Sequence, residues 1–142
     1  MISGWRRWRE LTWRDRIIFL QGLLLLPLAS LVLHLWRFQS VLFYLTDKTH
    51  LKDRQSEENP LHEARRIALM INASARRVPY DATCLRRSLV LWWLLRRRGI
   101  DSRLRIGARL QGDDFLAHAW VECQDCVVND SATVQSDFIT LL

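Results

Sequence analysis

The sequence predicts an α+β fold, with helices first and a small antiparallel sheet after them. Apolar residues recur at helical spacing as far as residue 99, and from residue 102 onward they alternate with polar residues as in a strand. A run of helices followed by a run of strands is typical of the α+β class. The 142 residues and the 49% hydrophobic content suit one domain with a packed core.

The first 45 residues form an apolar segment that we expect to be helical. Its run Ile17–Trp36 has no Lys, Arg, Asp or Glu in twenty residues, which is long enough to cross a bilayer. Pro27 would kink one helix or separate two. The polar residues Gln21, Ser30 and His34 make a membrane-spanning helix less favourable. We favour a helical hairpin that is buried or covered by a partner, with a membrane span as the alternative.

The chain is basic, with 21 Lys and Arg against 15 Asp and Glu and a formal charge of +6. Such a charge favours acidic partners: a peptide, a lipid surface or nucleic acid. Trp5, Trp8 and Trp13 stand among five arginines, as in segments that lie at a membrane surface, so peripheral membrane contact is a further expectation. We recognise no nucleic-acid-binding module and expect no nucleic acid partner. Three cysteines, an odd number, indicate a reducing compartment such as the cytoplasm.

A polar linker at residues 46–60, ending in Pro60, separates the N-terminal segment 1–45 from a core at 61–142. The core opens with "LHEARRIALMINASARRV", in which one helical face carries Ile67, Met70, Ile71 and Ser74. These residues predict an amphipathic helix that packs on the core.

A second core helix is expected over "CLRRSLVLWWLLRRRG", residues 84–99. Asp81 and Thr83 are both suitable N-cap residues before it. Arg96, Arg97 and Arg98 suit the negative end of the helix dipole, and Gly99 suits the left-handed residue that closes a helix.

Three strands complete the core. "SRLRIGARL" and "FLAHAWVEC" are joined by the turn "QGDD", and the two-residue turn Gln124–Asp125 leads to "CVVND" at 126–130. On the middle strand one face carries Phe115, Ala117, Ala119 and Val121, and the other carries Leu116, His118, Trp120 and Glu122.

Three residues of this arrangement form a candidate catalytic group. Cys84 is expected in the first turn of its helix, where backbone N–H groups and the helix dipole stabilise a thiolate. Pairing about Gln124–Asp125 brings His118 opposite the segment just after Asp130, whose carboxylate would orient the imidazole. Taken singly, each has an ordinary alternative: a small buried cysteine, a satisfied strand histidine and a turn-forming aspartate.

The segment Thr83–Asp130 also contains a set of motifs that occur together: Cys-Leu-x-x-Ser-Leu, a leucine-rich helix closed by Arg-Arg-Gly-Ile, then Ile-Gly, Ala-His-Ala-Trp-Val-Glu and Asn-Asp. With these motifs, about a third of the chain resembles the transglutaminase-like maturation proteins of lasso-peptide biosynthesis. The apolar, Arg-flanked N-terminal segment also looks like that family's, which favours a packed helix over a bilayer span.

The resemblance implies a papain-like or transglutaminase-like cysteine peptidase core, preceded by N-terminal apolar helices. By position, Cys84 would be the nucleophile, His118 the base and Asp130 the orienting residue. Such a peptidase removes the leader peptide from a ribosomally made precursor, so that a separate asparagine-synthetase-like cyclase can close the macrolactam. The family also implies a small leader-binding recognition protein, which we expect here as a separate chain. We expect no cofactor, since no Gly-rich phosphate loop is present.

On this mechanism the backbone N–H of Cys84 would be an oxyanion donor, because it lies at a helix N-terminus. Trp120 shares a strand face with His118, so it would either wall a substrate groove or have a structural role under the helix.

Other functions remain open. An enzyme with the same three residues could transfer the acyl group to an amine instead of water. "CQDC", Cys123 to Cys126, has a spacing that suits zinc or thiol exchange, but two small residues beside a hairpin turn are the simpler interpretation, and we expect no metal. A non-catalytic, membrane-associated binding protein is a further alternative.

Overall fold

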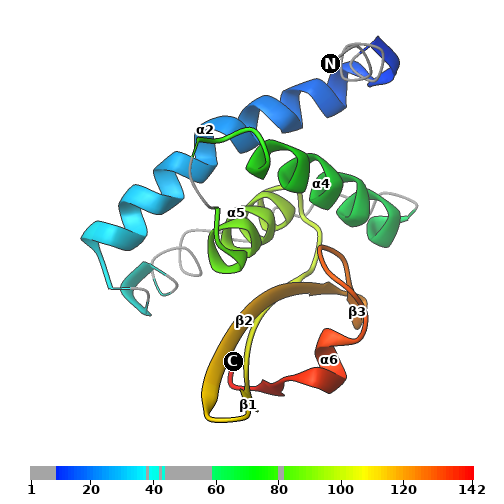
Figure 1. Cartoon of the computed structure of the whole chain (residues 1–142). Coiled ribbons are helices and arrows are strands. Elements are labelled where there is room, and N and C mark those ends of the chain that lie inside the picture. The colour runs from blue at the N-terminus through cyan, green and yellow to red at the C-terminus, as the bar shows by residue number, and fades with distance from the viewer. Residues whose placement is uncertain (1–8, 38, 42, 44–58, 80–81) are drawn as a thin grey trace.

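The computed structural model describes residues 9–37, 39–41, 43, 59–79 and 82–142. In this part of the chain a helical layer contains α2 (Trp13–Leu35), α4 (Pro60–Ala75) and α5 (Cys84–Arg97). A second layer contains the strands β1 (Arg103–Gln111), β2 (Asp114–Cys123), β3 (Cys126–Val127) and β4 (Ile139–Thr140), with the short helix α6 (Val134–Asp137) before β4. The α5 helix lies between α2 and α4 on one side and the sheet on the other (Figure 1). The α+β fold class predicted from the sequence is therefore found.

The N-terminal apolar segment contains one continuous helix, so the expected hairpin within residues 17–36 is wrong. The α2 helix continues through Pro27. Pro27 is exposed, so its ring does not disturb the packed side of the helix. On the packed side, Ile18 and Leu26 before the proline are buried in the main core, and Ala29, Val32 and Leu33 after it pack against that core. Packing on both sides of the proline keeps the two halves in one continuous helix.

A close contact fixes α2 on α4 at Gly22. A side chain at Gly22 would place a Cβ atom 2.5 Å from Ser74 Oγ and 3.1 Å from Ile71 Cδ1, so only glycine allows this approach. Ser74 is fully buried, and its hydroxyl donates a hydrogen bond to the carbonyl of Phe19 across the interface (2.9 Å). On the predicted inner face of α4, Ile67, Ile71 and Ser74 are buried and Met70 is half-buried.

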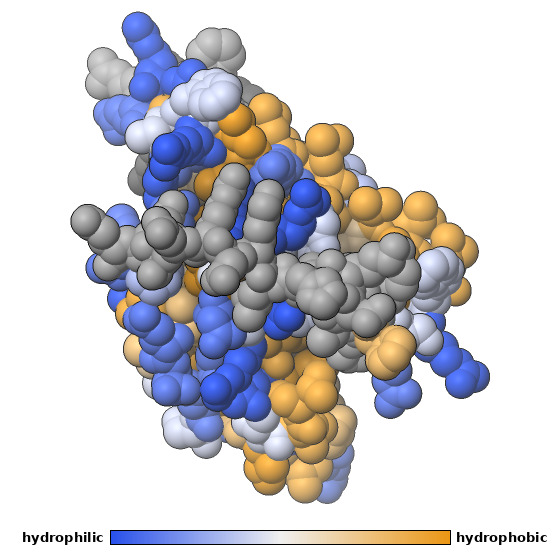
Figure 2. Space-filling model, turned by 180° about the vertical axis from the view of Figure 1, so that it is seen from behind, coloured by the Kyte–Doolittle hydropathy of each residue, from blue (hydrophilic) through white to orange (hydrophobic). Residues whose placement is uncertain are grey.

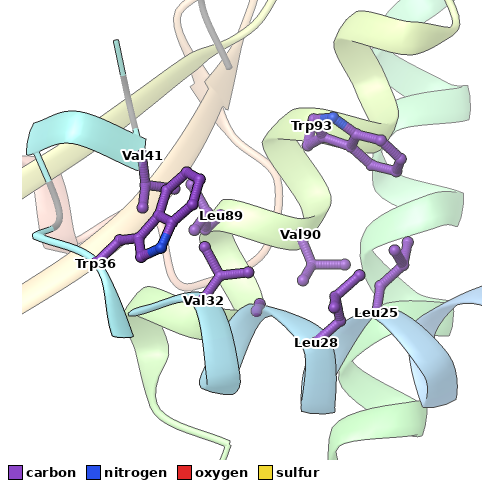
Figure 3. A pocket seen from close by; sticks show the side chains of 9 residues that line it. Leu25, Leu28, Val32, Trp36, Val41, Leu89, Val90 and Trp93 are labelled. Atoms are coloured by element: carbon purple, nitrogen blue, oxygen red, sulfur yellow. The ribbon is translucent and has the colours of Figure 1, made fainter. Parts of the chain in front are cut away.

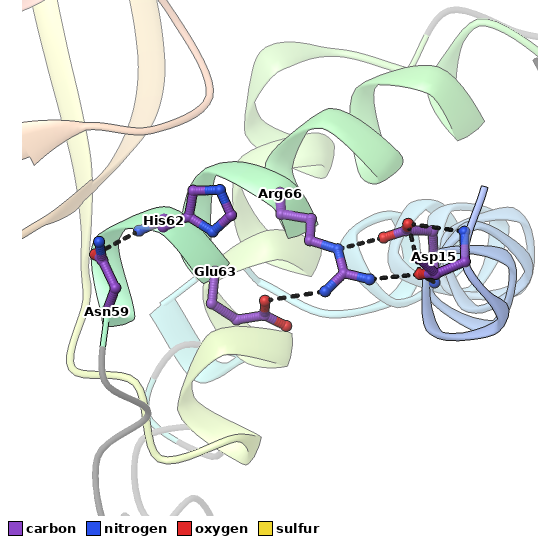
Figure 4. Close-up of polar contacts among 6 residues, drawn as sticks. Asp15, Asn59, His62, Glu63 and Arg66 are labelled. Atoms are coloured by element: carbon purple, nitrogen blue, oxygen red, sulfur yellow. Dashed lines mark hydrogen bonds and ion pairs between the residues drawn. The ribbon is translucent and has the colours of Figure 1, made fainter. Parts of the chain in front are cut away.

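Polar contacts tie the same two helices at the beginning of α2. Thr12 and Asp15 form a capping box, which satisfies the first backbone N–H groups of the helix. The Arg66 side chain from α4 then pairs with both Asp15 and Glu63 (Figure 4). Burial alone would raise the pKa of Asp15, but the hydrogen bonds from Arg66 and Thr12 outweigh it, and the pKa lies below its usual value.

The α4 and α5 helices begin and end as the sequence indicates. Most of the expected linker, residues 46–58, lies outside the described residues, but Asn59 caps α4 and Pro60 is its first residue. Thr83 occupies the N-cap position of α5, and Asp81 lies outside the described residues. The end of α5 has two arginines in its last turn, and Gly99 follows with φ of 77°.

The sheet has the strand order β3-β2-β1-β4, and all its neighbours are antiparallel. The predicted two-residue turn is present: Gln124 and Asp125 have φ of 51° and 61°, which is the left-handed geometry of the tightest hairpins. The residues of β2 divide between the two expected faces, but the face that meets the helices is the one with Val121, whereas the face with Trp120 was expected under the helix. Val121 belongs to the core shared with the helices, while Trp120 packs with Val127 and Val134 on the other face.

Two differences from the expected sheet concern its last part. The third strand is only two residues long: Val128 still donates a backbone hydrogen bond to the Val121 carbonyl (3.0 Å), but the pairing does not continue as far as residue 130. The segment that follows forms α6 and β4, neither of which was expected. Four-residue and two-residue elements are too short to give a periodic pattern, so nothing in the sequence marks them.

Candidate active site

His118 lies in the middle of β2, on the sheet face that points away from the helical core. Its ring lies 5.3 Å from that of Phe138 and 6.3 Å from that of Trp120, measured between centroids, and 22% of its side chain is exposed. Its cross-strand partner is Gly107. A Cβ atom at Gly107 would lie 2.8 Å from both Phe138 Cβ and Trp120 Cη2, so glycine leaves the space that these rings occupy.

Asp130 contacts His118 directly. Its Oδ2 lies 2.6 Å from His118 Nε2, and its Oδ1 accepts a hydrogen bond from the backbone N–H of Ser131 (2.7 Å). With both oxygens engaged, the carboxylate is held in one orientation. A carboxylate accepts from Nε2–H, so in the neutral imidazole Nδ1 carries the lone pair. Among the described residues no hydrogen bond is recorded for Nδ1, which is the nitrogen left for a proton donor.

Asn129 places Asp130 beside the strand, and sequence reasoning missed its role. Its Oδ1 accepts from the backbone N–H of Val121, and its Nδ2 donates to Ser88 Oγ, both at 2.9 Å. Asn72 on α4 donates to its backbone carbonyl (3.3 Å). The amide thus replaces the strand pairing that β3 lacks. The Asn-Asp pair was visible in the sequence, but the partners of the asparagine are too distant along the chain to be inferred.

Cys84 is the first residue of α5, and its side chain is half-buried. The Thr83 side chain makes no capping hydrogen bond, so it does not occupy the backbone N–H groups of the first turn. Backbone N–H groups at a helix N-terminus are suitable donors to an oxyanion. The roles of Cys84 as nucleophile and as backbone oxyanion donor remain predictions.

Ser88 links the helix of Cys84 to the strand of His118. It follows Cys84 by four residues, so both side chains lie on one face of α5. The buried Ser88 hydroxyl donates to the carbonyl of Ala119, the residue after His118 (3.0 Å). No hydrogen bond between Cys84 and His118 occurs among the described residues. The structure thus joins His118 to Asp130 directly, and it joins the Cys84 helix to the His118 strand one turn away.

Trp120 is fully buried, and the indole does not line an open groove. Its Nε1 donates to Glu122 (2.9 Å). This burial favours the structural alternative for Trp120. It also shows where the support lies, since the indole packs against Val134 and Phe138 rather than under α5.

Glu122 is a buried carboxylate that anchors the Trp120 face. It accepts hydrogen bonds from Trp120, from Gln135 (3.0 Å) and from Arg105 (3.1 Å). Burial raises its pKa, but the three hydrogen bonds and the Arg105 charge outweigh that effect, so the pKa lies below its usual value.

Cys123 and Cys126 flank the hairpin turn as cross-strand neighbours, and both are free thiols. Cys123 is buried, and burial raises the pKa of its thiol, which disfavours the thiolate needed for exchange. Within the described part of the chain no group of three or more His, Cys, Asp or Glu side chains has an arrangement that could hold a metal ion.

Comparison with protein families gives one match. A family model described as the transglutaminase-like superfamily matches residues 25–142. Comparisons with curated proteins and with solved structures found no match. The matched region begins inside α2 and includes Cys84, His118, Asp130 and the whole sheet.

Proposed function

This chain belongs to the transglutaminase-like superfamily, whose members are typically cysteine-dependent enzymes, and we propose that it is a cysteine peptidase that acts through Cys84, His118 and Asp130. The superfamily includes both cysteine peptidases and acyltransferases. One observation carries the proposal: the 2.6 Å contact between Asp130 Oδ2 and His118 Nε2, which leaves Nδ1 to accept a proton.

In the proposed mechanism His118 Nδ1 takes the proton of the Cys84 thiol, and the thiolate attacks the scissile carbonyl carbon. The resulting imidazolium is stabilised by Asp130, and it then protonates the leaving amine. The tetrahedral oxyanion receives a hydrogen bond from the Cys84 backbone N–H at the start of α5. Water then attacks the thioester, with His118 as base, and the acid product leaves with the thiol restored.

For the substrate we propose the leader region of a ribosomally made lasso-peptide precursor. The motifs of Thr83–Asp130 support this assignment through their resemblance to lasso-peptide maturation proteins. The proposed partners are a separate leader-binding recognition protein and an asparagine-synthetase-like cyclase that uses the cleaved product. The positive charge of the chain suits an acidic stretch of a precursor or a partner.

Cleavage of a precursor by the Cys84→Ala variant tests the proposal. The protein is incubated with precursor and recognition protein, and the products are identified by mass spectrometry. We expect Cys84→Ala to abolish cleavage, and Cys126→Ala, a matched control at a half-buried cysteine, to cleave as the unaltered protein does. Full cleavage by Cys84→Ala would rule out the peptidase mechanism.

The same assay separates hydrolysis from acyl transfer. In both reactions Cys84 forms a thioester, and the two differ only in whether water or an amine receives the acyl group. Adding a primary amine at increasing concentration should leave the free acid as the main product of a peptidase. Amide as the main product at low amine concentration would instead assign the acyltransferase alternative.

A further inference from the structure

One side of α2 is an exposed apolar face. Between Arg14 and His34 every exposed residue of this helix is apolar: Leu20, Leu24, Pro27, Leu28 and Leu31. Leu24 is 74% exposed, and the face ends in exposed tryptophans, Trp13 at one end and Trp36 at the other. At 1.5 Å per residue this face is about 35 Å long. Figure 2 shows it as a band of hydrophobic side chains along the helix.

An apolar pocket of about 300 Å³ opens beside this face, between α2 and α5. Leu25, Leu28 and Val32 line it from α2, and Val90 and Trp93 line it from α5, with Trp36 and Trp93 at its two ends (Figure 3). Every residue that lines it is apolar. The pocket is thus suited to a hydrocarbon chain rather than to a polar ligand.

A second pocket of about 400 Å³ continues from the first, because the two share Leu25 and Trp93. Its other lining residues include Leu24 of the exposed face and Arg97 and Arg98 at the end of α5. The Arg97 guanidinium lies 4.8 Å from the centre of the Trp93 ring, and it takes part in no ion pair recorded among the described residues. Positive charge therefore lies directly beside the hydrocarbon surface.

We propose that this face docks on an anionic phospholipid membrane, with α2 parallel to the surface. The leucines of α2 would enter the acyl region, one acyl chain would lie in the α2–α5 pocket, and a headgroup phosphate would pair with Arg97. Exposed arginines next to both ends of the face, Arg14 and Arg37, add to the attraction for anionic lipid.

Two observations favour a lipid surface over other occupants. A membrane-spanning α2 would have to leave α4, and would lose the Gly22–Ser74 contact and break the Asp15–Arg66 pair. The arginines around the face, Arg14, Arg37 and Arg97, all carry the same positive charge, which suits the uniform negative charge of anionic headgroups. The inference is independent of the proposed catalytic residues, none of which lines either pocket.

Sedimentation with lipid vesicles tests the proposal. The full chain is mixed with vesicles of phosphatidylcholine alone or of phosphatidylcholine with 30 mol% phosphatidylglycerol (roughly a physiological anionic surface). We expect the protein to pellet with the anionic vesicles, and less so with neutral vesicles or at about 1 M salt. In lipid with brominated acyl chains we expect tryptophan fluorescence to be quenched. Absence of both pelleting and quenching would overturn the proposal.

Variants locate the contact. The triple change Leu24→Gln, Leu28→Gln and Leu31→Gln alters only exposed positions and should weaken binding about tenfold or more. Leu69→Gln, at an exposed leucine of α4, is the matched control and should bind normally. Arg97→Gln should reduce the preference for anionic lipid, whereas Arg76→Gln, at another exposed arginine, should not.

If the apolar face of α2 is instead a protein interface, two further measurements distinguish it. Sedimentation velocity without lipid shows whether the unaltered chain self-associates, and circular dichroism shows whether the triple variant is folded. Equal vesicle binding by the triple variant and the unaltered chain would contradict the proposal. The proposal would also be contradicted if the unaltered chain formed a dimer, did not bind vesicles, and became monomeric on the triple change. The triple variant in solution should still cleave the precursor as the unaltered chain does. Loss of the membrane proposal would therefore not affect the peptidase proposal.

Discussion

Replacing Ser88 by alanine should destabilise the fold and slow the proposed cleavage. The Ser88 side chain is fully buried, and its hydroxyl makes two hydrogen bonds, donating to Ala119 O at 3.0 Å and accepting from Asn129 Nδ2 at 2.9 Å. Ser88→Ala leaves the Asn129 amide group without this partner in the interior. An unsatisfied buried group costs about 1–3 kcal/mol, and the second lost bond adds about 1 kcal/mol. We therefore expect the free energy of unfolding to fall by about 2–4 kcal/mol.

Urea unfolding followed by circular dichroism measures this loss, and it should appear as a lower midpoint with an unchanged slope. Thermal unfolding should shift by roughly 10 °C for a chain of this size. Ser30→Ala is the control, because in the described part of the chain that hydroxyl bonds only to the Leu26 carbonyl within its own helix, and it should cost under about 0.5 kcal/mol. A cost below about 1 kcal/mol for Ser88→Ala would refute the view that this hydroxyl joins α5 to β2. Cleavage at a temperature where both variants are folded should fall only for Ser88→Ala.

Three further predictions follow from the site and its support. Asp130→Asn should reduce the cleavage rate at least about 100-fold, because the imidazolium loses its counter-charge, whereas Asp137→Asn, at another exposed aspartate, should cleave normally; equal rates for the two would remove Asp130 from the mechanism. Gly107→Ala should cost about 1–3 kcal/mol in urea unfolding, since its Cβ would lie 2.8 Å from Phe138 Cβ, and a neutral effect would show that these rings move freely. The pKa of Glu122 is lower in the folded state than in the unfolded state, so the ionised carboxylate stabilises the fold. This stabilisation is complete above the unfolded-state pKa, and it is lost as the pH falls through the folded-state pKa. Glu122→Gln should therefore have a lower free energy of unfolding than the unaltered chain at pH 7, and this difference should become smaller below about pH 4.5. A difference that grows below that pH would contradict the assignment.

Regular elements could be predicted from the sequence because each depends on a local pattern. The spacing of Ile67, Met70 and Ile71 predicts the inner face of α4, and the alternation around His118 predicts which residues of β2 share a face, although not which face meets the helices. The register of the hairpin follows from the short turn at Gln124–Asp125. The close approach of Asp130 to His118 depends on that register, and it was therefore accessible without coordinates.

What could not be predicted depends on contacts between distant parts of the chain. The continuous course of α2 through Pro27 depends on packing against α4 and α5, which outweighs the local effect of the proline. The roles of Ser88 and Asn129 follow from hydrogen bonds across 31 and 41 positions. The support given by Phe138 requires knowing that the C-terminal segment folds back beside β1.

Asn129 meets three elements at once: its side chain bonds to β2 and α5, and its backbone carbonyl accepts from α4. Neither layer can open without breaking this junction, so the two layers should melt in a single cooperative transition. Amide protons of α4, α5 and the central strand should then exchange with deuterium at similar rates under native conditions. Because the joined segments are far apart in sequence, the junction forms late, and refolding should be slow for a chain of this length.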